Sequence, residues 1–182
     1  MHLQKVSTFF LLSLALGLSF LLTNCSGDPQ PETCKYKPPV AIFAGIDSFE
    51  NHSFEVTGQN AVEKVFFPRL NMDVELYQSG CNALQQEFRF HIKEAFPLNI
   101  PAPNCTIGIA RILYELSLED SNLAGLQQLA SSLEASAQGM AYNEKLLLEH
   151  SNTYVQIDKT HQTESAILSV IFLQGEEKAK AN

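Results

Sequence analysis

Two short stretches in the middle of the chain alternate strictly between apolar and polar residues. In residues 72–76, and again in residues 88–92, every second side chain is apolar. A period of two places one set of side chains on each face of a β-strand. Residues 79–82, with the sequence Ser-Gly-Cys-Asn, separate the two stretches and suit a loop. We therefore expect an antiparallel hairpin with one apolar face and one charged face.

Four further segments have the character of strands. Residues 40–43 are a short apolar run bounded by proline and glycine, and residues 53–56 and 155–157 are short and contain β-branched residues. Residues 166–173 are nearly all apolar, as expected of a strand buried on both faces. Residues 145–149 are compatible with either a helix or a strand.

Between these strand segments the chain changes to a helical pattern. Three prolines within residues 97–103, at positions 97, 101 and 103, exclude a helix and predict a rigid crossover. Thr106 then suits the N-cap of a first amphipathic helix, and Asp120 or the serine after it suits the N-cap of a second run over residues 126–140. The pattern leaves open whether residues 117–122 kink one helix or separate two.

The order of strands, helices and strands predicts an α+β fold over residues 40–175. We expect a single antiparallel β-sheet with one long or two consecutive amphipathic helices packed on one face. The face expected beneath the helices carries Phe88, Phe90, Ile92, Val155 and Ile157. The opposite face, which is free to meet solvent or a partner, carries Glu75, Arg89, His91 and Lys93.

The N-terminus has the pattern of an export segment. Lys5 provides a positive start, and residues 6–23 contain no charged side chain, which is the arrangement of a secretory signal. The tetrapeptide Leu22-Thr23-Asn24-Cys25 then resembles the lipid-attachment motif of bacterial lipoproteins. It departs from that motif at Asn24, where the family has Gly, Ala or Ser.

The resemblance to bacterial lipoproteins implies a location and a modification. Residues 1–24 would be a signal peptide, Cys25 would carry lipid (palmitate among its acyl chains), and the domain would lie in the cell envelope outside the cytoplasm. Ser26, standing where some lipoproteins carry a retention Asp, favours the outer membrane over the inner one. Ordinary signal cleavage and an uncleaved anchor at residues 6–23 are the alternatives, and both also export the domain.

The ends of the mature chain are expected to be extended. Residues 25–39 are rich in proline and poor in apolar side chains, so we predict a flexible tether between the membrane and the domain. Residues 176–182 are predicted to form a charged tail.

Three cysteines remain if Cys25 carries lipid. Disulfides are permitted outside the cytoplasm. Cys81 lies at the expected hairpin tip and Cys105 just before the expected helix, so we predict a Cys81–Cys105 disulfide with Cys34 left over in the tether. The alternative is that all three thiols are free. No Cys-x-x-Cys spacing occurs, which gives no indication of a redox dithiol or a zinc knuckle.

The charge of the chain and its motifs narrow the possible classes of function. The chain has 20 acidic and 12 basic residues and a net charge of −8, which argues against a nucleic-acid partner. No catalytic residue, metal site or cofactor is predicted, because nucleophile, phosphate-loop and metal-ligand motifs are absent from the sequence. The histidines at positions 52, 91, 150 and 161 are scattered, and a pairing among Glu63, Asp73 and Glu75 has no support beyond chance.

Two classes of function fit this sequence. The favoured one is a non-catalytic binding module, held to the membrane by its lipid anchor, for an envelope protein, an envelope polymer or a small ligand. An inhibitor or immunity-type lipoprotein that neutralises a basic envelope hydrolase is one form of such a module. The alternative is an envelope hydrolase whose site is built from dispersed residues.

Overall fold

The computed structural model describes residues 34–93, 97, 99–149, 151–161 and 165–175. Within these residues seven strands form one sheet in the order β1-β2-β3-β4-β7-β6-β5, and every neighbouring pair is antiparallel. The strands are β1 (Glu50–Thr57), β2 (Asn60–Phe67), β3 (Met72–Gly80), β4 (Leu84–Ile92), β5 (Leu146–Leu147), β6 (Thr153–His161) and β7 (Ala166–Gln174). The helices are α2 (Ala102–Ser117) and α3 (Ala124–Ser136).

The predicted hairpin is confirmed as β3 and β4. Leu76 lies opposite Phe88, and Met72 lies opposite Ile92. The apolar residues of both strands therefore point to one side of the sheet, and Leu76 and Phe88 are completely buried there. The period-two pattern specified this register, since a slip by one residue would turn every apolar side chain to solvent.

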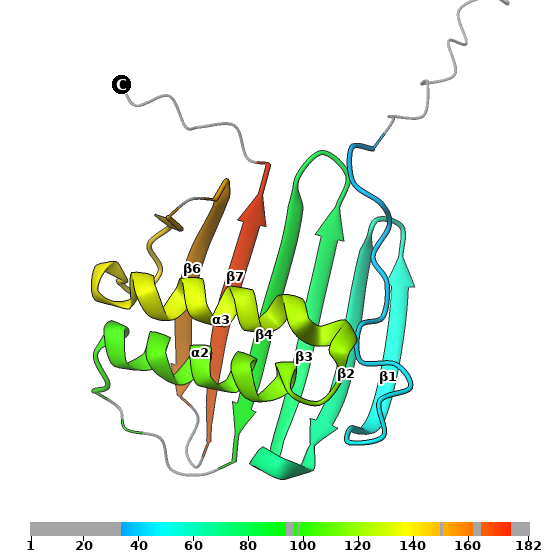
Figure 1. Ribbon diagram of the computed structural model, residues 1–182, viewed down its shortest axis with the longest axis horizontal. Coiled ribbons are helices and arrows are strands. Elements are labelled where there is room, and N and C mark those ends of the chain that lie inside the picture. Colours follow the sequence, from blue (N-terminus) through cyan, green and yellow to red (C-terminus); the bar gives the residue numbers. More distant parts are fainter. Residues whose placement is uncertain (1–33, 94–96, 98, 150, 162–164, 176–182) are drawn as a thin grey trace, which may run out of the picture. The chain divides into compact units, whose positions relative to one another are not determined.

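Both helices lie against one face of the sheet, as predicted (Figure 1). Their buried residues form one core with the sheet, and Ile109, Leu113 and Leu133 are fully buried in it. A 3-10 turn, Ser121–Leu123, separates the helices, and the Asp120 carboxylate accepts a hydrogen bond from the backbone N–H of Asn122. This turn answers the question that the sequence left open, because residues 102–136 form two helices rather than one kinked helix.

The first helix begins earlier than the sequence indicated. It starts at Ala102, within the proline-rich stretch, because Pro101 occupies the N-cap position and Pro103 falls in the first turn, where a missing N–H costs nothing. Thr106 is inside the helix rather than at its cap. Its hydroxyl donates a hydrogen bond to the carbonyl oxygen of Ala102 at 2.8 Å.

Residues 34–49, which we call the N-terminal strap, cover the part of the core that the helices do not reach. The strap crosses in front of β2 and β1 on the side of the helices (Figure 1). Phe43 and Phe49 are buried, and their rings contact each other edge-on at 5.2 Å between centroids. Phe49 makes a similar contact with Phe67 of β2 at 5.3 Å.

The predicted strand at residues 40–43 is wrong, because the backbone of the strap bonds to side chains. The backbone N–H groups of Ile42 and Phe43 donate to the two carboxylate oxygens of Glu63 at 2.8 and 2.9 Å. The amide nitrogen of Gln78 donates to the carbonyl oxygen of Val40 at 2.9 Å. These two polar residues of the sheet take the place of a neighbouring strand.

The disulfide differs from the predicted Cys81–Cys105 pair. Cys34 is bonded to Cys81, and Cys105 is a free, buried thiol. The physical reason is the path of the strap, which runs beside the tip of the β3–β4 hairpin and donates a hydrogen bond from the Tyr36 N–H to the Cys81 carbonyl at 2.9 Å. Cys105 instead faces the core from the apolar side of α2.

The strap also revises the predicted domain boundary. The compact unit begins at Cys34 rather than Val40, so the last residues of the predicted tether belong to the domain. Residues 1–33, with the signal, Cys25 and most of the tether, lie outside the described residues, as does the predicted tail at 176–182.

We predict that reduction of the Cys34–Cys81 disulfide destabilises the domain. The bond closes a loop with a sequence separation of 47 residues, and its loss should lower the free energy of unfolding by about 2–4 kcal/mol. Denaturant titrations of the full chain with and without dithiothreitol measure the difference. The Cys34→Ser/Cys81→Ser variant should have the unfolding midpoint of the reduced wild type, and dithiothreitol should not change that midpoint. Equal midpoints for oxidised and reduced wild type would contradict the pairing.

Candidate binding face

The sheet has a second face that points away from α2, α3 and the strap (Figure 1). We call it the open face. Strand register places one row of its residues in line across the sheet, and this row runs Ser53, Lys64, Glu75, Arg89, Ser169, Asp158. As predicted, Glu75, Arg89 and His91 share this face.

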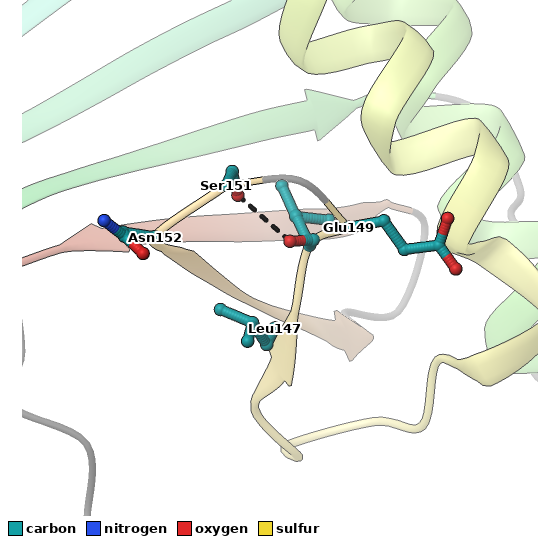
Figure 2. Close-up of a pocket in the computed structure, with 5 residues that line it drawn as sticks. Leu147, Glu149, Ser151 and Asn152 are labelled. Carbon is teal, nitrogen blue, oxygen red and sulfur yellow. Dashed lines mark hydrogen bonds between the residues drawn. The ribbon is translucent and has the colours of Figure 1, made fainter.

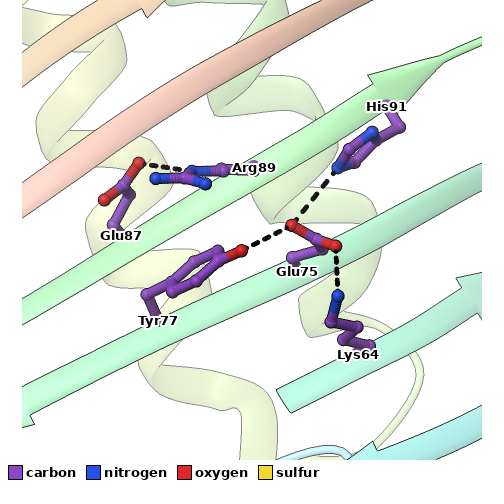
Figure 3. Close-up of polar contacts among 6 residues, drawn as sticks. All are labelled: Lys64, Glu75, Tyr77, Glu87, Arg89 and His91. Carbon is purple, nitrogen blue, oxygen red and sulfur yellow. Dashed lines mark hydrogen bonds and ion pairs between the residues drawn. The ribbon is translucent and has the colours of Figure 1, made fainter. Parts of the chain in front are cut away.

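Glu75 is the centre of a polar network on the open face (Figure 3). One carboxylate oxygen accepts a hydrogen bond from the Lys64 ammonium at 2.8 Å, and the other accepts one from the Tyr77 hydroxyl at 3.0 Å. The Nε2 atom of His91 lies 3.5 Å from the second oxygen and makes no hydrogen bond there. Protonation of the imidazole would turn this contact into an ion pair.

Two further ion pairs flank Glu75. The Arg89 guanidinium contacts the Glu87 carboxylate at 2.6 Å and lies over the Tyr77 ring, 4.1 Å from its centroid. The Lys93 ammonium contacts Asp73 at 3.0 Å. It also lies 4.6 Å from the centroid of the Phe66 ring. Each cation of this network is therefore held by a carboxylate of the same face, and two of them also cover aromatic rings.

The network shifts the pKa values of its members. Burial by itself would raise the pKa of Glu75, but the hydrogen bonds from Lys64 and Tyr77 outweigh burial, and the pKa is lowered. The hydrogen bond to Glu75 raises the pKa of Lys64. Burial, and then the hydrogen bond to Glu75, raise the pKa of Tyr77. Glu75 is therefore a stable carboxylate at neutral pH rather than a proton donor.

A shallow hollow lies beside this network on the open face. Its volume is about 290 Å³. The polar side chains that line it are Asn51, Ser53, Lys64, Asp73, Glu75 and His91. Because it is small and open, it suits a protruding side chain of a partner better than an enclosed small molecule.

Strand β7 adds two half-buried apolar side chains to the open face, on either side of Ser169. The sequence predicted that residues 166–173 are buried on both faces, and this is correct for the core face and, on the open face, for Leu173 alone. Ala166, Leu168 and Val170 are buried beneath the helices, whereas Ile167 and Ile171 on the open face are only half-buried. No described element covers them, so apolar side chains in a central strand face outward.

The three acids Glu63, Asp73 and Glu75 do not come together, because they lie on opposite faces of the sheet. Asp73 and Glu75 lie on the open face, whereas Glu63 is fully buried on the core face. His52 is in β1, and its Nε2 atom lies 2.8 Å from the Glu63 carboxylate. Neither this contact nor strand β2 was predicted, although Glu63 stands at an inward-facing position between Ala61 and Val65.

Cys105 and Tyr142 are potentially reactive groups, but their contacts serve the fold. Burial raises the pKa of the Cys105 thiol. A thiol with a raised pKa is a poor nucleophile. The Tyr142 hydroxyl donates to the carbonyl oxygen of Ile100 at 2.9 Å. This contact joins the segment after α3 to the crossover before α2.

A second hollow, of about 500 Å³, lies at the turn between β5 and β6 (Figure 2). Leu147, Leu148, Glu149, Ser151 and Asn152 line it. The Ser151 hydroxyl donates to the Leu148 carbonyl at 3.1 Å, so the polar groups here stabilise the turn itself. His150 lies outside the described residues.

Comparisons with known proteins and two further searches add the following findings. The chain matches no protein-family model, no curated protein and no solved structure. Among the residues that the structure describes, no group of three or more His, Cys, Asp or Glu could hold a metal ion. In that same part of the chain no helix is both long and apolar enough to span a bilayer.

We predict a pH-dependent contribution of Glu75 to stability. Because its pKa is lower in the folded protein, the contribution is complete above the unfolded-state pKa of about 4.3 and disappears as the pH falls through the folded-state pKa. Glu75→Gln should therefore cost about 1 kcal/mol at pH 7 and almost nothing in strong acid. Urea titrations at several pH values measure this, with Glu134→Gln on the exposed side of α3 as the control. A cost that is independent of pH would contradict the assignment.

Proposed function

We propose that this protein is a lipid-anchored bacterial envelope lipoprotein whose domain is a non-catalytic binding module. The binding surface would be the open face. The single observation that carries this proposal is the asymmetry of the sheet, whose core face is covered by two helices and the strap while its other face, with apolar side chains in a central strand, has no described cover. Apolar surface of this kind marks interaction sites in soluble domains.

The anchor is inferred from the residues before the domain. Leu22 to Cys25 supply the lipid-attachment motif, and the compact unit starts at Cys34. Residues 26–33 would then span at most about 30 Å when fully extended. A tether of this length would keep the domain near the membrane surface, where an envelope partner is within reach.

Binding is favoured over catalysis because the charged groups already have structural partners. Asp73 and Glu75 are each held by a lysine, and the pKa of Glu75 is lowered, whereas a hydrolase needs an acid of raised pKa as its proton donor. The Glu63 carboxylate is occupied by the backbone of the strap and by His52. These contacts support a module of the inhibitor or immunity type over an envelope hydrolase.

The anchor is tested by metabolic labelling. Full-length protein expressed in bacterial cells with labelled palmitate should carry the label and sediment with membranes, and Cys25→Ser should lose the label. Cys34→Ser is the matched control, because it removes a cysteine nine positions away from Cys25 and should leave labelling unchanged. Label that persists in Cys25→Ser would refute lipidation at this residue.

The binding role is tested by crosslinking the full-length protein in intact envelopes. Ile171→Ser should remove a crosslinked component, because it takes apolar contact area from the open face. Leu118→Ser, which changes an exposed leucine at the end of α2, should leave the component in place. Equal crosslinking in both variants would exclude the open face, and turnover of an envelope polymer by the purified protein would favour the hydrolase.

A further inference from the structure

We infer that the partner of the open face is a protein with a basic rim around an apolar contact, rather than a polysaccharide. This inference rests on the proposed function and specifies the chemistry of the ligand. Three observations on the open face lead to it, namely its balance of charge, the state of its aromatic rings and the position of its apolar residues.

The open face has more carboxylates than its own cations neutralise. Its cations pair internally, as Lys64 with Glu75, Arg89 with Glu87 and Lys93 with Asp73. Two more acids of this face, Glu55 on β1 and Asp158 on β6, form no ion pair within the described residues. Within the described residues, the Asp158 carboxylate accepts a hydrogen bond from the backbone N–H of Lys159 at 2.6 Å.

These two acids lie on opposite sides of the face. Glu55 is opposite Val62 near one edge of the sheet, and Asp158 is opposite Ser169 toward the other edge. Ile167 and Ile171 lie between them, on either side of Ser169 in β7. Apolar contact area beside charged side chains is typical of protein–protein interfaces. Glu55 and Asp158 are both acidic, and the chain has a net charge of −8. A complementary partner therefore carries cations.

The aromatic rings of the network are poorly placed to bind sugar. Polysaccharide recognition commonly uses a free ring face against which a sugar can stack. Here the guanidinium of Arg89 covers one side of Tyr77, and the ammonium of Lys93 covers one side of Phe66. The same cations are tied to carboxylates, so freeing either ring would break an ion pair.

The test uses full-length protein in non-ionic detergent and cytochrome c as a basic protein probe. Binding is measured by calorimetry at low ionic strength. The probe should bind the wild type, and cytochrome c with succinylated lysines should not. Glu55→Gln/Asp158→Asn should weaken binding by about five- to tenfold. Glu134→Gln/Glu144→Gln removes the same charge from exposed positions outside the sheet and should weaken it by less than about twofold.

A second pair of variants separates docking from general attraction between opposite charges. Ile171→Ser should weaken binding of the probe several-fold, whereas Leu118→Ser should not. Equal losses in the two double variants, no effect of Ile171→Ser, or no binding of the native probe would each overturn the inference. Soluble peptidoglycan fragments serve as the polysaccharide probe. If these fragments bind and Ile171→Ser abolishes that binding, the inference fails while the proposed binding module stands. If neither probe binds and crosslinking finds no partner, both fail.

Discussion

The burial of one face of the β3–β4 hairpin is the constraint on which the rest of the structure depends. Leu76, Phe88 and Phe90 are completely buried under the helices, and side chains of this size supply most of the stabilisation of a domain of this length. Because successive residues of a strand point to opposite faces, burying these three forces Glu75 and Arg89 outward. The core and the candidate binding face are thus two consequences of one alternating pattern.

The two helices cannot cover a seven-stranded sheet alone, and the N-terminal strap completes the cover with a different set of interactions. Phe43 and Phe49 fill the core above β1 and β2. A strap without a neighbouring strand would leave buried N–H groups without acceptors, which is costly. Glu63 accepts two of these N–H groups, and the Cys34–Cys81 disulfide holds the beginning of the strap at the hairpin tip.

The open face carries ion pairs that hold its charged side chains in place. Its ion pairs are partly exposed, so each contributes little to folding, and their main effect is to hold lysine and arginine side chains in fixed positions on a flat surface. Pre-ordered side chains lose less conformational freedom when a partner docks. The half-buried isoleucines of β7 then provide the apolar contact that an entirely polar sheet face would lack.

The sequence by itself determined the strand periodicity, the helix pattern and the acidic charge, because these depend on spacing along the chain. From them followed the α+β class, the β3–β4 hairpin, and the placing of Glu75, Arg89 and His91 on one face. Only the tertiary structure decided which residues distant in sequence meet. It paired Cys34 with Cys81 instead of Cys105, brought Glu63 to the strap and His52, and left one face of β7 uncovered. These outcomes depend on how the strap and the helices divide one face of the sheet between them, and no local pattern encodes that division.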